Sequence, residues 1–363
     1  EFILHFLAEQ YKDKSNVIGE ILKYSAEMKF ADAFQKATGD TLEEFDKKFW
    51  QYIEQRYSPL RAKIDIADEA KSVSEGTLLG AQGQFFITRN EVYGRETLFL
   101  NWTDGTETKS KKLMEGGRLK SVDVRGFEIE LSPEFGFQEH SASFVSSTTL
   151  IYAMDTGGKD ALVIQNFTFN KNKNKFRLGE KKKIYFKGIR EIQYPAMISE
   201  QEVAFVGRAD GIFAELFVAN LISGESKKLT SAQRTYRGLS YSKAYNALVT
   251  SIENEATKSY DLAFYNLSRG TFTFLTQTPE SEFYASFSPD GKQLLYVSDK
   301  GLVHNIHRYN FETKIDEILT DAKIGVFRPH WFSNGGLAFN WISRGRIAVK
   351  IAPLPSVKSI DSA

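Results

Sequence analysis

The sequence contains no cysteine in 363 residues, and this absence removes several kinds of chemistry. Disulfides, a thiolate nucleophile and cysteine-ligated zinc are all excluded. No run approaches the roughly 18 apolar residues that a membrane helix needs. An excess of one charge is also missing, because 47 Lys and Arg face 46 Asp and Glu, a net charge of +1. The overall balance therefore gives no electrostatic reason to expect nucleic acid or an acidic membrane surface as a partner.

Motifs of common enzyme classes are missing too. Gly238-Leu239-Ser240-Tyr241-Ser242 lacks the last glycine of a nucleophile elbow, and no glycine-rich phosphate loop occurs. His304 and His307 are three apart in a predicted strand, which places them on opposite faces. None of the five histidines belongs to a His-Glu-x-x-His zinc motif: His5, His140, His304, His307 and His330. We therefore expect no catalytic residues, no metal and no cofactor in this chain.

Residues 1–57 have the periodicity of helices, because apolar side chains recur at three- and four-residue spacings. One apolar stripe, Phe30 to Ala37, ends at Gly39, a residue that tolerates a left-handed helix end. The last helix opens with Thr41-Leu42-Glu43-Glu44, the pattern of a capping box, and stops before Pro59. Four short helices bury little by themselves, so we expect them to dock on another surface.

After Pro59 the pattern changes to short alternating strands that repeat. Leu-Thr pairs begin at positions 229, 275 and 319, and aromatic-Ser pairs begin at positions 241, 287 and 332. A four-stranded unit of ~40–50 residues is typical of a β-propeller blade. The sequence therefore predicts a mainly β protein: a six-bladed propeller over residues 58–356, a helical segment before it and a tail at 357–363.

The last predicted blade lacks a fourth strand. It runs through Arg328–Phe332, Leu337–Trp341 and Ile347–Ile351. Lys63-Ile64-Asp65-Ile66 alternates correctly, so we expect residues 62–67 to close the ring beside Ile347–Ile351 and remove an exposed sheet edge. An alternative places residues 118–131 in a seventh blade.

One repeat carries a complete turn motif, Phe287-Ser288-Pro289-Asp290-Gly291-Lys292, and degenerate versions stand at Lys243-Ala244 and Asn334-Gly335. This motif resembles the repeat of TolB-like propellers, the WD-like Pro-Asp family, over roughly residues 60 to 353. The resemblance implies a propeller fold and a role in cell-envelope assembly in a Gram-negative bacterium, in the periplasm or associated with the envelope.

The helical segment resembles the last helices of gluzincin (peptidase MA) metalloprotease domains. The match rests on Ala33-Phe34, Gly39, Thr41, Leu42, Phe45 and Trp50, while the usual glycine break is absent near Tyr11-Lys12-Asp13. The zinc ligands of such a domain would precede Glu1. A chain that opens at Glu1 inside an apolar helical pattern is either a mature product or a segment cut from a longer protein, and we expect the second.

One basic run and one insertion interrupt the repeats. We interpret Lys171 to Arg177, continued by Lys181 to Lys183, as a solvated hairpin tip, with contact to an anionic partner as the alternative. Residues 115–143 form an insertion that contains an alternating stretch from Val122 to Leu131. We expect its apolar side to pack on the propeller or the helices; the alternative is an exposed docking edge for another chain.

These observations favour a non-catalytic, monomeric propeller that serves as a protein-interaction platform. The rival hypothesis is a zinc metalloprotease with its catalytic domain upstream, whose propeller selects or gates the substrate. A propeller that binds a small ligand or glycan is a third hypothesis. We expect a protein or peptide partner, and neither nucleic acid nor a transmembrane segment.

The partner is expected at one mouth of the ring, where the inner strands begin and hairpins join the second and third strands. Mixed charges around a narrow channel suit a polar polypeptide better than an apolar small molecule. The alternative is that these charges are only solvated. The candidate residues are Arg234, Arg237, Glu280, Glu282, Arg328 and His330 before or in the inner strands, and Arg208, Asp210, Glu253, Asp299 and Arg344 in the hairpins.

Overall fold

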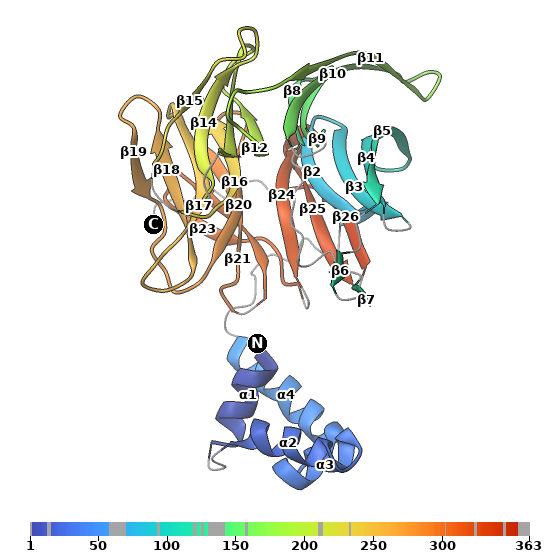
Figure 1. Ribbon diagram of the computed structural model, residues 1–363, viewed down its shortest axis with the longest axis vertical. Coiled ribbons are helices and arrows are strands. Elements are labelled where there is room, and N and C mark those ends of the chain that lie inside the picture. The colour runs from blue at the N-terminus through green and yellow to red at the C-terminus, as the bar shows by residue number, and fades with distance from the viewer. Residues whose placement is uncertain are drawn as a thin grey trace, which may run out of the picture. The chain divides into compact units, whose positions relative to one another are not determined.

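A computed structural model gives the architecture of the chain (Figure 1). It describes residues 2–12, 16–57, 70–92, 95–118, 122–124, 127–129, 142–156, 159–209, 213–231, 234–301, 303–322, 325–343 and 346–354. The chain forms two compact units, helical and β, that divide between Arg61 and Ala62. No helix among the described residues has the length and apolar character needed to cross a membrane.

The helical unit contains the four helices that the periodicity predicts: α1 (Phe2–Gln10), α2 (Val17–Ser25), α3 (Phe30–Thr38) and α4 (Leu42–Tyr57). Its core is formed by apolar side chains that face inward from α1, α2 and α3, including Leu7, Ile21 and Phe34. Gly39 ends α3 with a left-handed backbone at φ 88°, as its position in the sequence predicts.

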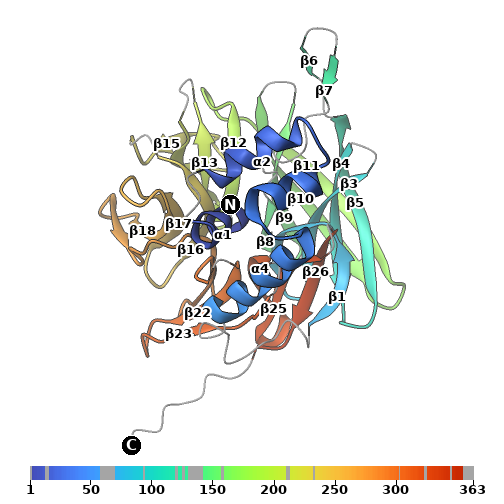
Figure 2. The same cartoon turned by 90° about the horizontal axis from the view of Figure 1, so that it is seen from below.

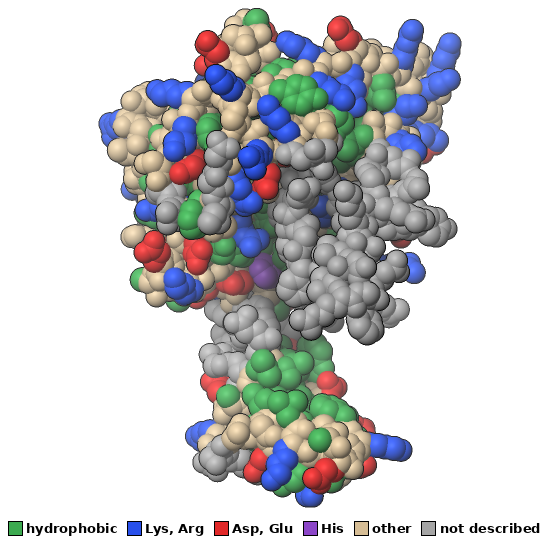
Figure 3. All heavy atoms as spheres, in the orientation of Figure 1, with side chains coloured by type: hydrophobic (Ala, Val, Ile, Leu, Met, Phe, Trp, Pro, Cys, Tyr) green, Lys and Arg blue, Asp and Glu red, His purple; other side chains and the backbone are tan. Residues whose placement is uncertain are grey.

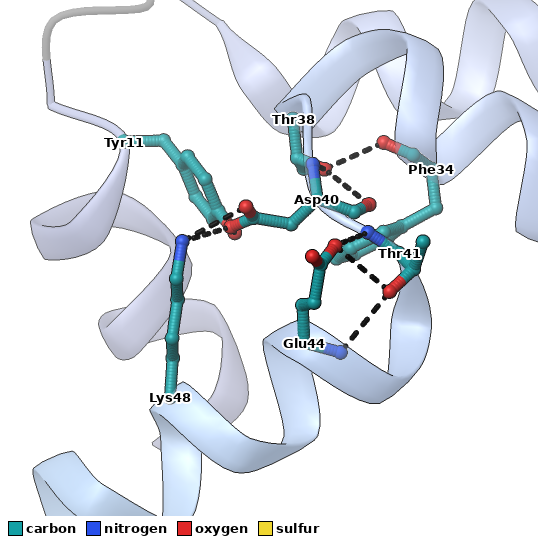
Figure 4. Close-up of polar contacts among 7 residues, drawn as sticks. All are labelled: Tyr11, Phe34, Thr38, Asp40, Thr41, Glu44 and Lys48. Atoms are coloured by element: carbon teal, nitrogen blue, oxygen red, sulfur yellow. Dashed lines mark hydrogen bonds and ion pairs between the residues drawn. The ribbon is translucent and has the colours of Figure 1, made fainter.

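A capping box and a partly exposed ionic contact fix the start of α4 (Figure 4). The Thr41 amide donates to Glu44 Oε2 (2.8 Å), and the Glu44 amide donates to Thr41 Oγ1 (3.2 Å), so the predicted box is confirmed. Asp40 accepts hydrogen bonds from the Tyr11 hydroxyl (2.6 Å) and from Lys48 Nζ (2.7 and 2.8 Å). This carboxylate therefore joins the segment after α1 to α4.

Six antiparallel four-stranded sheets form the blades of a propeller, which confirms the predicted fold class. The first blade contains β2 (Thr77–Gln82), β3 (Phe85–Val92), β4 (Arg95–Thr103) and β5 (Thr108–Arg118). The second contains β8 (Ala142–Ser146), β9 (Thr149–Asp155), β10 (Asp160–Asn170) and β11 (Lys175–Ile184). The third contains β12 (Glu191–Met197), β13 (Glu202–Arg208), β14 (Glu215–Asn220) and β15 (Ser226–Lys228).

The remaining blades follow the same order. The fourth contains β16 (Tyr236–Ser242), β17 (Ala247–Glu253), β18 (Tyr260–Asn266) and β19 (Thr271–Phe274). The fifth contains β20 (Glu282–Phe287), β21 (Gln293–Ser298), β22 (Asn305–Asn310) and β23 (Asp316–Ile318). The sixth contains β24 (Val326–Phe332), β25 (Gly336–Ser343), β26 (Arg346–Ala352) and β1 (Lys71–Glu75).

The ring closes with β1 beside β26, where Lys71 pairs with Ile351 and Glu75 with Ala348. The predicted closing strand, residues 62–67, lies outside the described residues. Its predicted place beside β26 is wrong, because β26 has β25 on one edge and β1 on the other. A strand from the N-terminal side does complete the last blade, but it lies further along the chain than predicted.

The first strand of each blade packs against the first strands of its two neighbours, so six inner strands surround the axis (Figure 2). Apolar clusters fill the spaces between blades. Fully buried side chains between the first and second blades include Ile87, Leu150 and Tyr152. These interfaces hold the inner strands, and therefore the mouth of the ring, in fixed positions.

Two segments singled out in the sequence are hairpins. The insertion contains β6 (Val122–Val124) paired with β7 (Phe127–Ile129) as a separate two-stranded sheet, so it adds no seventh four-stranded blade among the described residues. The basic run contains the β10–β11 turn at 171–174, and the rest of its cations lie in β11. The tip is therefore shorter than predicted, because most of these cations belong to the outer strand that begins at Lys175.

Candidate functional site

Backbone bulges recur at the mouth ends of the inner strands. β12, β16, β20 and β24 each shift register after their first residues. Each bulge holds one residue in the left-handed region: Tyr194 (φ 50°), Gly238 (70°), Tyr284 (54°) and Arg328 (51°). A non-glycine residue pays about 1–2 kcal/mol for this backbone conformation. Such strained residues gather at functional sites more often than elsewhere.

Neighbouring bulges touch each other. A Cβ added to Gly238 in β16 would lie 3.3 Å from the Cα of Tyr284 in β20. Two features therefore favour glycine at position 238: its positive φ, and the close approach of the next inner strand, which leaves little room for a Cβ atom. This contact brings the side chains on either side of the two bulges onto one short arc of the mouth.

Two arginines lie over aromatic rings on this arc. The guanidinium of Arg237 is 5.0 Å from the ring centre of Tyr260 and 5.9 Å from that of Phe283. The guanidinium of Arg328 is 4.7 Å from the ring centre of Tyr284. Both arrangements are within the range of cation–π attraction. Residues of the fourth, fifth and sixth blades thus form one connected group.

Further rings extend the group toward the sixth blade. The His304 ring lies 5.9 Å from that of Phe283 and 4.8 Å from that of Phe327. Every member keeps some exposed surface, so the group is part of the protein surface. We call it the mouth cluster: Arg237, Tyr260, Phe283, Tyr284, His304, Phe327 and Arg328.

Glu282 was predicted as a charge of the mouth, and the structure corrects this. Its side chain is buried, with 4% exposure, and accepts hydrogen bonds from Thr276 Oγ1 (2.8 Å) and Thr278 Oγ1 (2.9 Å). Burial raises the pKa of Glu282 to about 7, and the charges of Asp261 and Asp299 add to the effect. Glu282 is therefore an internal group that keeps its proton to a higher pH than an exposed glutamate does.

The two histidines near the mouth are uncharged at neutral pH. Loss of contact with water lowers the pKa of His330, and the positive charge of Arg328 lowers it further, to about 4. Burial also lowers the pKa of His304. His307 lies elsewhere, with its Nδ1 2.9 Å from Asp316 Oδ2 and its ring stacked on Tyr296. Among the described residues, no group of three or more His, Asp or Glu side chains could hold a metal ion.

Several of the other predicted mouth residues have contacts outside the mouth cluster. Arg208 Nη1 contacts Glu191 Oε1 (3.2 Å) in the third blade, and the Arg234 guanidinium lies 5.8 Å from the Phe272 ring. Asp299 accepts a hydrogen bond from the Ser281 amide (2.7 Å). Glu253 and Glu280 are partly exposed. Asp210 and Arg344 lie outside the described residues.

Sequence reasoning found the two arginines but missed the aromatic residues beside them. A signal was present in the repeat spacing, since the residue pairs at three of these bulges fall 46 and 44 positions apart, as the Leu-Thr pairs do. Arg237-Gly238, Phe283-Tyr284 and Phe327-Arg328 occupy the same place in successive repeats. Aligning the repeats on this place would have put aromatic and arginine side chains together.

No protein-family model and no curated protein matches the sequence. Among solved structures, TolB from Acinetobacter baumannii is similar, with a TM-score of 0.51 and 15% identity. The match covers 74% of this chain and 63% of that one. An oligogalacturonate lyase from Vibrio parahaemolyticus gives a TM-score of 0.45 and 11% identity, over 81% of this chain and 96% of the lyase. At such identities the likeness shows the fold alone, a TolB-like six-bladed propeller.

Proposed function

We propose that this chain is a non-catalytic propeller in the bacterial cell envelope that binds an extended segment of a partner protein at the mouth cluster. The observation that carries the proposal is the pair of arginines held against aromatic rings across three blades. Arginine and tyrosine are among the residues that supply most of the binding energy at protein interfaces. The envelope location rests on the resemblance of the repeats to TolB-like propellers.

The geometry of the cluster favours a polypeptide over a small apolar ligand. Its rings are partly exposed and alternate with guanidinium groups, so it offers stacking surfaces and hydrogen-bond donors together. The backbones of Tyr284 and Arg328 keep their strained conformations because the surrounding strands impose them, so the stacked side chains are in place before a partner arrives. Preorganisation of this kind reduces the entropy lost on binding.

The alternative is a propeller that selects or gates substrate for a zinc metalloprotease whose catalytic domain lies upstream. One observation favours it: Leu22, Phe30 and Trp50 of the helical unit are 68%, 56% and 54% exposed. Such apolar exposure is typical of a surface that another domain covers. The test is the upstream reading frame: a His-Glu-x-x-His motif, with zinc content and chelator-sensitive proteolysis of the full-length protein, would support the alternative and its absence would reject it.

The main proposal is tested with a display library of random peptides selected on the chain. Arg237→Glu combined with Arg328→Glu should weaken binding of the selected peptides by at least about 10-fold, because both stacking cations are reversed. Lys243→Glu combined with Lys314→Glu is the matched control, since both lysines are exposed in turns at the opposite ends of the strands. The control pair should leave peptide affinity unchanged.

A photo-crosslinking amino acid at Tyr284 supplies an independent readout if the double reversal disturbs folding. Peptides should crosslink there and not from a probe at Lys243. The proposal fails if the mouth reversal leaves affinity unchanged and crosslinks form equally at both positions. If affinity instead falls when residues 122–129 are altered, the β6–β7 hairpin is the docking edge.

A further inference from the structure

The β10–β11 hairpin carries a high positive charge, although the net charge of the whole chain is close to zero. Residues 171–183 contain six lysines and one arginine against a single carboxylate, Glu180. Their local charge is therefore +6, and since the chain has a net charge of +1, the other residues sum to −5. We call the cations of this segment the basic hairpin: Lys171, Lys173, Lys175, Arg177 and Lys181 to Lys183.

The basic hairpin is open to solvent. All seven cationic side chains are exposed, and within the described part of the chain none forms an ion pair. Figure 3 shows Lys and Arg side chains gathered along the edge of the propeller where Figure 1 places β10 and β11. Partial burial, and then the charge of Lys183, lower the pKa of Lys181, as expected where cations crowd together.

Exposed apolar side chains lie next to these cations. Lys182 Nζ donates a hydrogen bond to the carbonyl of Leu221 (3.0 Å), which precedes Ile222 in the β14–β15 turn. A Cβ added to Gly224 in the same turn would lie 4.0 Å from the carbonyl oxygen of Tyr185. Ile222 and Tyr185 are 69% and 46% exposed. The surface therefore combines an isoleucine and a tyrosine with a dense set of cations.

Edge protection explains only part of this arrangement. β11 is the outer edge of its sheet, and lysines on edge strands commonly prevent pairing with other chains. That function needs one or two charges, and it gives no reason for an exposed isoleucine on the neighbouring blade. Cations beside exposed aromatic and aliphatic side chains are instead the composition of surfaces that lie on anionic membranes.

We infer that the basic hairpin, together with Tyr185 and Ile222, is a docking surface for an anionic phospholipid bilayer. The hairpin is ten residues long on its outer strand, which gives a row of about 30 Å, several times the ~8–10 Å screening length. Its cations face the phosphate layer, and Ile222 and Tyr185 enter the interfacial region. This surface is separate from the mouth cluster and does not depend on the function proposed for it.

The test is cosedimentation of the whole chain with vesicles. Binding should occur to phosphatidylcholine vesicles that contain about 30 mol% phosphatidylglycerol, be absent from pure phosphatidylcholine, and weaken as salt is raised. Lys173→Gln, Lys175→Gln and Lys183→Gln together should lower the partition coefficient on the order of 100-fold at low salt, since each cation is worth about 5-fold. Lys243→Gln, Lys258→Gln and Lys314→Gln remove the same charge elsewhere and should change it less than about 3-fold.

The apolar contribution is tested by Ile222→Ser, which should weaken vesicle binding, whereas Ile222→Leu should retain it. The inference is overturned if the two triple variants behave alike, if Ile222→Ser binds as the parent does, or if poly-glutamate in solution binds as tightly as the vesicles. It is also overturned if the hairpin variant self-associates while its affinity for vesicles is unchanged, because the lysines then only protect the edge.

Discussion

The guanidinium of Arg328 lies 4.7 Å from the ring centre of Tyr284, and both residues hold a left-handed backbone. They occupy equivalent bulges in neighbouring inner strands, β24 and β20. A bulge inserts a residue that is not paired in the ladder and changes the direction of the side chains near it. The cation–π contact between the fifth and sixth blades therefore depends on two strained positions that lie side by side.

This strain can be measured by glycine substitution at Arg328. Because φ is 51° there, Arg328→Gly should be more stable than Arg328→Ala by about 1 kcal/mol in urea unfolding. Arg237, one residue before the equivalent bulge residue Gly238, is the control, and it has no positive φ. There the order should reverse, with glycine less stable than alanine by roughly 0.5–1 kcal/mol. The same order at both sites would contradict the strain.

Glu282 should make the stability of the propeller fall as pH rises. Its folded pKa of about 7 lies above the ordinary value of 4.5, so the folded protein holds more protons than the unfolded chain between these values. The free energy of unfolding therefore decreases through this window, by roughly 3 kcal/mol in total. Urea unfolding at pH 5 and pH 8 measures the effect.

Glu282→Gln isolates this group from the others that titrate in the same range. His330 acts with the opposite sign, because its folded pKa of about 4 lies below the ordinary 6.5 and its contribution to stability grows as pH rises. The Gln variant should be more stable than the parent at pH 8 and should lose less stability between pH 5 and pH 8. An identical pH profile for parent and variant would show that Glu282 has an ordinary pKa.

The blade count could be predicted because the repeat signature marks a hydrogen bond. In three successive blades the threonine of the Leu-Thr pair accepts from the amide at the start of the third strand: Thr230 from Leu216 (3.0 Å), Thr276 from Leu262 (2.8 Å) and Thr320 from Ile306 (2.9 Å). Because each of these blades uses the same hydrogen bond, each repeat has threonine at the same position. Turn chemistry and capping boxes are local in the same way, so sequence reveals them.

The repeat spacing could have brought the residues of the mouth cluster together, but their backbone conformation and the burial of Glu282 are properties that sequence does not display. Positive φ at tyrosine or arginine has no residue signature, unlike the same conformation at Gly238. Burial of Glu282 also depends on Thr276 and Thr278, which come from the end of the preceding blade. Charged residues near a loop are usually exposed, so the sequence-based placement of Glu282 followed a rule that this packing overrides.

The closing strand was misplaced for a related reason. Lys71-Ser72-Val73-Ser74-Glu75 contains a single apolar residue, so it lacks the alternation that identifies a strand. This strand pairs with β26 because the ring closes there, and the Gly76 amide, just after the strand, donates to the carbonyl of Ile347 (2.9 Å). Contacts between distant parts of the chain decide this register.

Two truncations should bracket the closing strand. A chain that starts at Ala70 retains β1, so its propeller should unfold at the same urea concentration as that of the full chain. A chain that starts at Thr77 loses β1 and exposes the edge of β26, so it should aggregate or lose several kcal/mol of stability. Size-exclusion chromatography and urea unfolding measure both. Equal behaviour of the two truncations would show that β1 does not close the ring.

Asn340 should be the most sensitive single side chain at the closure. It is 2% exposed in β25; its Oδ1 accepts from the Leu78 amide (2.8 Å) and its Nδ2 donates to the Gly76 carbonyl (2.9 Å). Asn340→Ala leaves a buried donor and an acceptor without this partner, so we expect a loss of about 2–4 kcal/mol in urea unfolding. Asn166→Ala is the control, because Asn166 is exposed and accepts a hydrogen bond from a side chain, Thr149 Oγ1 (2.9 Å), and not from a buried amide; its loss should stay below about 1 kcal/mol. The protonated carboxyl of Asn340→Asp offers both an acceptor and an O–H donor, so at low pH this variant should lie between the parent and Asn340→Ala. It should become less stable as the carboxyl ionises, because the donor to the Gly76 carbonyl is then lost. Equal losses for Asn340→Ala and Asn166→Ala would mean that the sixth and first blades are held together by β1 and the apolar core alone.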